Sequence, residues 1–305
     1  MIEEEQVLEE LIRMADERLR ALRDYRKREE AIAAFLKESR PKEARELAQF
    51  FVEYGLLLRK WGTGKPPSDY KLAKTVWNGY EDFAPFLREV VTQVSRFDAE
   101  FLYPAAGTPG LPKAVRSRLL TFCAKLERGG MLRARKEGED RLKVELLKRD
   151  IKFINGGWGE RVTLYLVDRT LRKFTARQSH DYRLFWNVRL SEPGSEQIKM
   201  ELDVVARVED HFYIFETKTG EDLDVPKWVE RSELFGMKQG RSTFFTCTPR
   251  DEIRPKYFKP YRLLPFSELE AMFTNCLEHD FPPPPPTVLH ATLSESLEGA
   301  PLPTA

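Results

Sequence analysis

Apolar residues recur every three or four positions through most of the first hundred residues, a spacing that predicts helices. Residues 1–39 are rich in Glu, Arg, Leu and Ala and contain neither Gly nor Pro, which favours one long helix or two helices broken near Arg23 to Arg28. The same spacing predicts further helices over 41–60, 70–78 and 83–97. We therefore expect residues 1–110 to form a helical module.

Five apolar residues near the N-terminus repeat with the spacing of a coiled-coil heptad. They are separated by 4, 3, 4 and 3 positions and comprise Leu8, Ile12, Ala15, Leu19 and Leu22. One interpretation is a dimerisation helix, which would make the protein a homodimer. The other is an amphipathic helix that lies on its own domain, since a coiled coil normally shows about three or four such heptads.

Residues 111–150 follow a different pattern. A helix predicted from Pro112 to about Glu127 is followed by Gly129 and Gly130, and then by strands at 131–136 and 141–147. A winged-helix unit ends in this order of helix, break and hairpin, so we predict a winged-helix-like segment.

The basic charge of the chain is concentrated in this segment. Residues 101–150 carry 12 basic and 6 acidic side chains. The basic residues of the hairpin alternate with apolar neighbours, which predicts one cationic face, and they are Arg133, Arg135, Arg141 and Lys143. The face either contacts the phosphates of a nucleic acid or is simply solvated.

Residues 151–281 predict a mixed α+β or α/β unit. The expected elements are a helix over 157–174, strands over 183–190, 199–208 and 212–217, a helix over 226–240 and a strand over 242–248. A last strand and helix are expected over 261–273. Residues 282–305 begin with five consecutive prolines and are predicted to be disordered.

Composition excludes several classes of protein. The 305 residues include 50 basic and 49 acidic side chains, a net charge of +1, but the local basic excess keeps nucleic acid open as a partner. No apolar run approaches the ~20 residues that span a bilayer, and the N-terminal MIEEEQ is acidic where a signal peptide is basic. We expect a soluble cytoplasmic protein with no membrane partner.

The cysteines and histidines do not predict a metal site. Cys123, Cys247 and Cys276 are far apart and form no CxxC pair, so we expect free, buried thiols. The four histidines show neither HExxH nor HxH spacing. A metal ion would therefore have to be held by carboxylates.

Two predicted strands carry the residues of greatest chemical interest. Side chains alternate between the faces of a strand, so Met200, Leu202 and Val204 should share one face and Asp203 the other. On the next strand Glu216 and Lys218 should point together. A short hairpin connection near residues 209–211 makes the strands antiparallel neighbours and would bring Asp203 close to Glu216. Carboxylates this close repel each other unless a cation lies between them, and their oxygens favour Mg²⁺ or Mn²⁺.

The helix before these strands supplies a further acid. Glu160 heads an apolar stripe that continues through Leu164, Val167 and Leu171, which predicts that Glu160 points toward the sheet. The alternative is that Glu160 only interacts with the helix dipole near the N-terminus of the helix.

These residues carry a resemblance to a known family. Asp203 followed by Glu216-Thr217-Lys218 resembles the paired motif of the PD-(D/E)xK nuclease superfamily, and the αβββαβ order resembles its core, which is restriction-endonuclease-like. More narrowly, GGWGE at 156–160, ELDV at 201–204 and FETKTG at 215–220 are similar to the nuclease domain of CRISPR ancillary nucleases. In those proteins a CARF sensor, a winged helix and the nuclease follow one another. The likeness covers residues 112–275.

The resemblance implies a metal-dependent nuclease site. Asp203 and Glu216 would bind Mg²⁺ or Mn²⁺ with the carbonyl of Thr217, and Glu160 would complete the site directly or through water. Lys218 would orient the attacking water or stabilise developing charge. The products would carry a 5′-phosphate and a 3′-hydroxyl group. Residues 1–100 depart from the family, because they show helical periodicity where a CARF sensor alternates strands and helices.

We therefore expect an endonuclease that hydrolyses phosphodiester bonds, with DNA as the favoured substrate and RNA as the alternative, in prokaryotic antiviral defence or mobile-element biology. A second hypothesis is a winged-helix DNA-binding or regulatory protein whose nuclease fold is catalytically silent. A third is a structural partner that acts through the N-terminal helices. Residues near the helix at 226–240 are candidate phosphate contacts or ordinary solvated charges, and they are Lys227, Lys238, Gln239 and Arg241.

Overall fold

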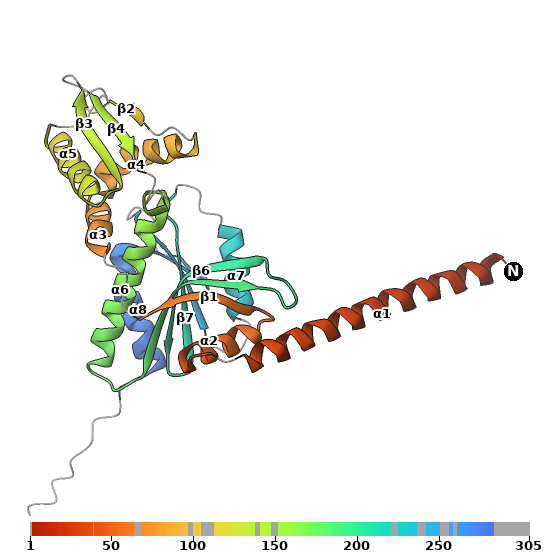
Figure 1. Ribbon diagram of the computed structural model, residues 1–305. Helices are drawn as coiled ribbons and strands as arrows, with labels where there is room; N and C mark the ends of the chain where they lie inside the picture. Colours follow the sequence, from red (N-terminus) through yellow and green to blue (C-terminus); the bar gives the residue numbers. More distant parts are fainter. Residues whose placement is uncertain are drawn as a thin grey trace, which may run out of the picture.

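The fold is mixed α/β, with two sheets and helices on both faces of the larger one (Figure 1). The computed structural model describes residues 2–38, 40–64, 69–96, 100–104, 113–137, 141–147, 152–220, 225–236, 242–250, 256–258 and 261–283. The helices are α1 (Ile2–Lys37), α2 (Lys42–Val52), α3 (Tyr70–Asn78), α4 (Tyr80–Ser95), α5 (Lys113–Arg128), α6 (Trp158–Thr175), α7 (Val225–Gly236) and α8 (Phe266–Asp280). A π-helical turn, η1 (Phe153–Gly157), leads into α6.

The larger sheet has the strand order β1-β5-β6-β7-β8-β10-β9. Its strands are β1 (Leu57–Thr63), β5 (Tyr182–Ser191), β6 (Ile198–Val208), β7 (His211–Thr217), β8 (Ser242–Thr248), β9 (Lys256–Phe258) and β10 (Tyr261–Pro265). Strands β5, β6 and β7 pair antiparallel, while β8 runs parallel to β7 and β10 parallel to β8. The chain order α6-β5-β6-β7-α7-β8 is the αβββαβ order that the sequence predicts.

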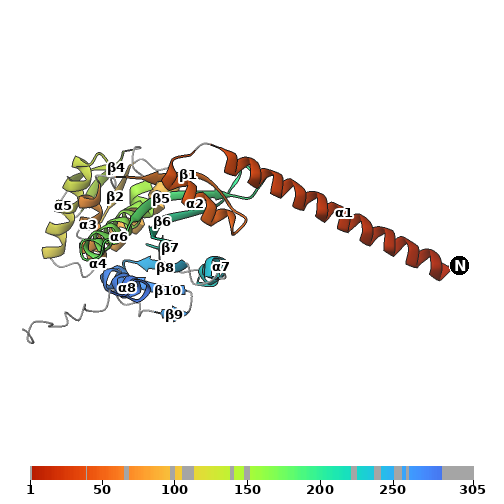
Figure 2. The same cartoon turned by 90° about the horizontal axis from the view of Figure 1, so that it is seen from below.

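Two buried apolar clusters cover the two faces of this sheet. Helices α6 and α8 lie on one face, where Phe215 is fully buried and stacks on Phe245 with ring centroids 4.7 Å apart (Figure 2). Helices α2 and α7 lie on the other face, where Phe51 and Phe235 pack against Ile214. The sheet is therefore the middle of three layers, and its strand ends between the helices can hold a site.

The end of α2 corrects one prediction. The helix predicted over 41–60 ends at Val52, and Leu57–Thr63 is instead edge strand β1, paired with β5. Gly55 has a φ of 69°, and the amide of Leu56 donates to the carbonyl of Phe51 at 3.0 Å. This glycine-terminated cap ends the helix and turns the chain into the sheet. The first 110 residues are therefore not purely helical.

Helix α1 projects from the body of the protein as one continuous helix of 36 residues (Figure 1). Its C-terminal end is anchored by Phe35, which is 3% exposed and belongs to the cluster beneath α2. Ile12, Leu19 and Leu22 are 50–59% exposed. The interpretation of an amphipathic helix lying on its own domain is therefore wrong for this stretch. The side chain of Leu8 lies outside the described residues.

A smaller sheet with the order β2-β4-β3 packs with α3, α4 and α5. Its strands are β2 (Glu100–Tyr103), β3 (Leu132–Glu137) and β4 (Arg141–Leu146). Helix α5 ends at a glycine cap, in which Gly130 has a φ of 71° and the amide of Met131 donates to the carbonyl of Leu126. One buried cluster runs from this unit into the α6 face of the larger sheet. The domain boundaries near residues 110 and 150 stay predictions.

The expected alternation of faces along β6 holds on only part of the strand. Met200 and Leu202 belong to the cluster beneath α2, whereas Val204 belongs to the cluster beneath α6. The change of face falls at Asp203. On the neighbouring strand β5, Trp186 pairs with Val204 and Val188 pairs with Leu202. Asn187, which lies between these two pairs, has a φ of 50°. Asn is among the residues that adopt this left-handed conformation most readily.

The remaining predictions concern the thiols, the tail and membranes. Cys123, Cys247 and Cys276 are free and buried, as predicted. Disorder was predicted for residues 282–305, and of these 284–305 lie outside the described residues. Across the described parts of the chain, none of the helices is both long and apolar enough to cross a bilayer.

Candidate functional site

A cleft of about 540 Å³ opens where the N-terminal end of α6 meets the ends of β6 and β7. One side of the cleft is lined by Glu160, Asp203, Thr217 and Lys218. The other side is α4, which contributes Tyr80, Ala84, Leu87, Arg88, Val91 and Thr92. Three of the four residues predicted from sequence as catalytic thus line the same cleft.

Asp203 is half-buried at the centre of this group. Its Oδ2 accepts a hydrogen bond from the backbone amide of Thr217 at 2.7 Å, which fixes the carboxylate between β6 and β7. Burial raises the pKa of Asp203 to about 7, and the charge of Glu160 adds to the rise. The group therefore titrates near neutral pH, and it has one oxygen with no hydrogen bond described.

Glu216 lies behind the cleft rather than in it. Its side chain is almost fully buried, and Oε1 lies 3.4 Å from a guanidinium nitrogen of Arg231 on α7. Burial raises the pKa of Glu216 well above its usual value, the charge of Asp203 raises it further, and Arg231 opposes the rise. The charges of the two predicted metal ligands, Asp203 and Glu216, therefore interact. Sequence patterns did not single out Arg231, which forms an ion pair with Glu216.

Glu160 and Lys218 complete the charged side of the cleft. Burial raises the pKa of Glu160, while the positive charges of Arg161 and Lys218 lower it. The backbone amide of Lys218 donates to the carbonyl of Cys247 at 2.8 Å, which ties the end of β7 to β8. Lys218 and Thr217 line the cleft, whereas Glu216 points toward α7. The hydroxyl oxygens of Thr217 and Thr163 lie 2.8 Å apart.

Glycines allow α6 to approach this strand end closely. Gly156 has a φ of 112° within η1, a conformation that only glycine adopts easily. A Cβ atom on Gly159 would stand 2.5 Å from Cγ2 of Thr219 and 2.8 Å from Cγ2 of Thr217. The GGWGE sequence therefore lets α6 begin against the strand end, with Glu160 at the cleft.

We expect Gly159→Ala to destabilise the protein by about 1–3 kcal/mol, because the new methyl group overlaps the buried Thr217 side chain. Thermal unfolding monitored by circular dichroism measures the effect. Gly220→Ala is the matched control, since a Cβ atom at Gly220 meets nothing within 4 Å. Equal Tm values for the two variants would contradict this account of the close approach.

The carboxylate oxygens at the cleft are of the kind that binds a hard divalent cation with part of its water shell. Within the described residues, no three His, Cys, Asp or Glu side chains are close enough as they stand to hold a metal ion by themselves. Mg²⁺, however, is usually bound by one or two carboxylates together with waters and substrate phosphates. Asp203 and Glu216 carry carboxylate oxygens of this kind, and the charge of Glu160 raises the pKa of Asp203.

The predicted basic hairpin carries charges of both signs on its exposed face. Arg133, Arg135, Arg141 and Lys143 are exposed on β3 and β4, as expected. Arg133 lies 3.5 Å from Glu145, and Lys143 lies 2.6 Å from Glu100 on β2. The basic side chains share the exposed face as expected, but acidic neighbours pair with two of them, and their contact with nucleic acid stays a prediction. Lys238, Gln239 and Arg241 lie outside the described residues, as does the side chain of Lys227.

Helix α4 is the part of the site that the sequence did not reveal. The hydroxyl of Tyr80 donates to the carbonyl of Thr219 at 2.9 Å and joins the start of α4 to the loop after Lys218. The contact joins residues 139 positions apart. No motif near Tyr80 indicates this neighbour, because contacts between distant segments depend on the whole fold.

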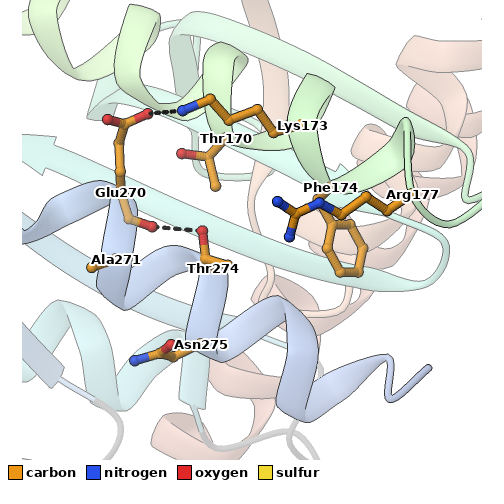
Figure 3. Close-up of a pocket in the computed structure, with 8 residues that line it drawn as sticks. All are labelled: Thr170, Lys173, Phe174, Arg177, Glu270, Ala271, Thr274 and Asn275. Atoms are coloured by element: carbon orange, nitrogen blue, oxygen red, sulfur yellow. Dashed lines mark hydrogen bonds and ion pairs between the residues drawn. The ribbon is translucent and has the colours of Figure 1, made fainter.

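A second hollow, of about 310 Å³, lies between α6 and α8 (Figure 3). Lys173 points at Glu270 with 3.7 Å between their charged atoms, and Glu270 also pairs with Arg169. The charges that line it are therefore partly neutralised by the protein itself. It is remote from the acidic group, and the cleft remains the better candidate.

Comparisons with known proteins show a likeness in fold. The chain is similar to the crystal structure of protein VC1899 from Vibrio cholerae, with 17% identity and a TM-score of 0.50 over 77% of this chain and 61% of that one. It is also similar to Can2 from Sulfobacillus thermosulfidooxidans, solved in complex with cyclic tetra-adenylate, with 14% identity and a TM-score of 0.49 over 75% of this chain and 59% of that one.

The chain matches about three fifths of the length of each of these structures. At these identities the likeness to VC1899 indicates a shared fold alone. No protein-family model and no curated protein sequence matches the chain.

Proposed function

We propose that the protein is a metal-dependent nuclease that hydrolyses phosphodiester bonds in the cleft beside Asp203. The observation that carries the proposal is that Asp203, Glu160 and Lys218 line one cleft, with the buried carboxyl group of Glu216 behind them, where the charge of Asp203 raises its pKa. Buried like charges are costly in a fold, so a group that gathers them needs a function that uses them. DNA is the proposed substrate.

In this proposal Asp203, Glu216 and the Thr217 carbonyl hold Mg²⁺ or Mn²⁺, with Glu160 contacting it through water. The bound ion would lower the pKa of a water molecule and offset charge on the phosphate oxygens. Arg231 holds the Glu216 carboxylate in place from α7. Lys218, at the mouth of the same group, orients the attacking water or stabilises the negative charge that develops on the phosphate.

In this proposal the smaller sheet and the helices packed with it bind the nucleic acid. Their order α4-β2-α5-β3-β4, with β2 paired to β4, supports a winged-helix-like arrangement in which α5 and the β3-β4 hairpin are exposed. Arg135 and Arg141 are exposed on the hairpin and could contact phosphates. Because α4 also lines the cleft, this unit and the acidic group would hold the same substrate molecule.

The resemblance in sequence motifs suggests a setting in prokaryotic antiviral defence. Can2 was solved with cyclic tetra-adenylate, but the N-terminal third of this chain consists of α1, α2, β1, α3 and α4 rather than alternating strands and helices. We propose that a different signal, acting through these elements, controls the site.

A cleavage panel tests the proposal. Supercoiled plasmid, linear duplex, single-stranded DNA and RNA are each incubated with the protein and Mg²⁺, Mn²⁺ or a chelator. We expect nicked or linear plasmid with either metal ion and none with the chelator, and new ends that carry a 5′-phosphate. Absence of metal-dependent cleavage on every substrate, with binding to duplex DNA retained, would favour the DNA-binding protein with a silent nuclease fold.

A further inference from the structure

Helix α1 carries an apolar stripe that nothing in the described chain covers. Every described side chain from Glu10 to Glu30 is exposed, and Ile12, Leu19 and Leu22 are each at least half exposed. They share one face of the helix with Ala15, at heptad spacing. Large apolar residues in such a row favour burial against a partner.

The charges of α1 are separated along its length. Residues 2–17 contain seven acidic side chains and one basic side chain, whereas residues 18–32 contain six basic and three acidic ones. The first half therefore has a net charge of −6 and the second half +3. Two such helices attract when they run antiparallel, because each acidic half then lies beside a basic half. Parallel helices would place like charges together.

The apolar stripe is compatible with the same arrangement. In an antiparallel pair, Ile12 of one helix can pack against Leu22 of the other, and Ala15 against Leu19. This register centres the pair near Glu17, which is also where the charge changes sign. Each large side chain then faces a complementary one, and the small Ala15 accommodates Leu19.

The length of the free helix also fits. A pair centred on Glu17 overlaps over residues 2–32, and in the structure Ile32 is where the helix begins to be covered by its own protein body. The pairing would therefore use the whole projecting part of α1. We infer that α1 binds a second copy of this chain as an antiparallel two-helix coiled coil centred on Glu17.

The mass of the full chain in solution tests the inference. Sedimentation equilibrium at about 20 µM should give twice the chain mass of 35.6 kDa. The double variant Ile12→Lys/Leu19→Lys should sediment as a monomer. Met14→Lys is the matched control, because Met14 is 56% exposed but lies off the stripe, and it should remain a dimer. These residues contact no core, so circular dichroism and Tm should show that each variant is folded.

The direction of the helices is tested by disulfide formation. The native cysteines are buried, so single exposed cysteines report on α1 alone. Ile12→Cys and Leu22→Cys proteins carrying different tags should form a mixed disulfide when combined and oxidised, and little homodimeric disulfide when oxidised separately. Efficient homodimeric disulfides for each variant would indicate parallel helices and overturn the inference. A wild-type chain that stays monomeric at this concentration would overturn it as well, whatever the outcome of the cleavage panel.

Discussion

Replacing Asp203 with Asn should lower metal-dependent cleavage by about 100-fold or more. Asn preserves the shape of the side chain and the oxygen that accepts the hydrogen bond from the Thr217 amide, which is 2.7 Å long. The negative charge that would hold the metal ion is lost, however. Initial rates of plasmid nicking with Mg²⁺, with both proteins at equal concentration, measure the effect.

Glu201→Gln is the matched control. Glu201 lies two positions before Asp203 on β6, but its side chain is 46% exposed and pairs with Arg189 at the surface. This variant makes the same change of charge and should keep nearly full activity. Asp203→Asn should still retard duplex DNA in a gel, since the proposed DNA-binding surface lies on the β3-β4 hairpin. Equal activity of the two variants would remove Asp203 from the site.

The stability of the metal-free protein should decrease as the pH rises from about 4 to 7. The pKa of Asp203 is about 7 in the folded protein and near 3.8 when the group is free in water. Between these values the folded state holds a proton that the unfolded state has released, so raising the pH favours unfolding. At pH 8 we expect metal-free Asp203→Asn to be about 4 kcal/mol more stable than the wild type, since each unit of pKa difference corresponds to about 1.4 kcal/mol.

Thermal unfolding in a chelator at several pH values measures this effect, as the difference in Tm between wild type and Asp203→Asn. The difference should be small at pH 4 and should grow toward pH 8, while Glu201→Gln should follow the wild type. Adding Mg²⁺ at pH 8 should raise the Tm of the wild type and leave that of Asp203→Asn nearly unchanged. A difference that does not depend on pH would mean that the carboxyl group of Asp203 does not titrate in this range.

The elements that form the larger sheet were predictable because their patterns are local. Strands β5 to β8 show the apolar, β-branched and aromatic composition of buried strands, and α6 shows a regular apolar stripe. The reversal at Asp203 was not predictable from alternation, and it falls opposite Asn187 of the neighbouring strand, which has a left-handed conformation.

Two helix ends show why β1 was missed. Gly55 and Gly130 end α2 and α5 with the same left-handed cap, in which the next residue donates back to the helix at 3.0 Å. The pair Gly129-Gly130 signalled a break, whereas the lone Gly55 stands before three leucines that continue the apolar pattern of the helix. Arg231 and the α4 side of the cleft gave no local signal, since each reaches the site through tertiary packing.

The length of α1 would separate the two catalytic clefts of a dimer. At about 1.5 Å per residue its 36 residues extend about 54 Å, and antiparallel pairing would place the two protein bodies at opposite ends of this rod. The two clefts could not meet at one base pair of a duplex. Such an enzyme would nick strands independently, and on plasmid the nicked circle should accumulate well before the linear form.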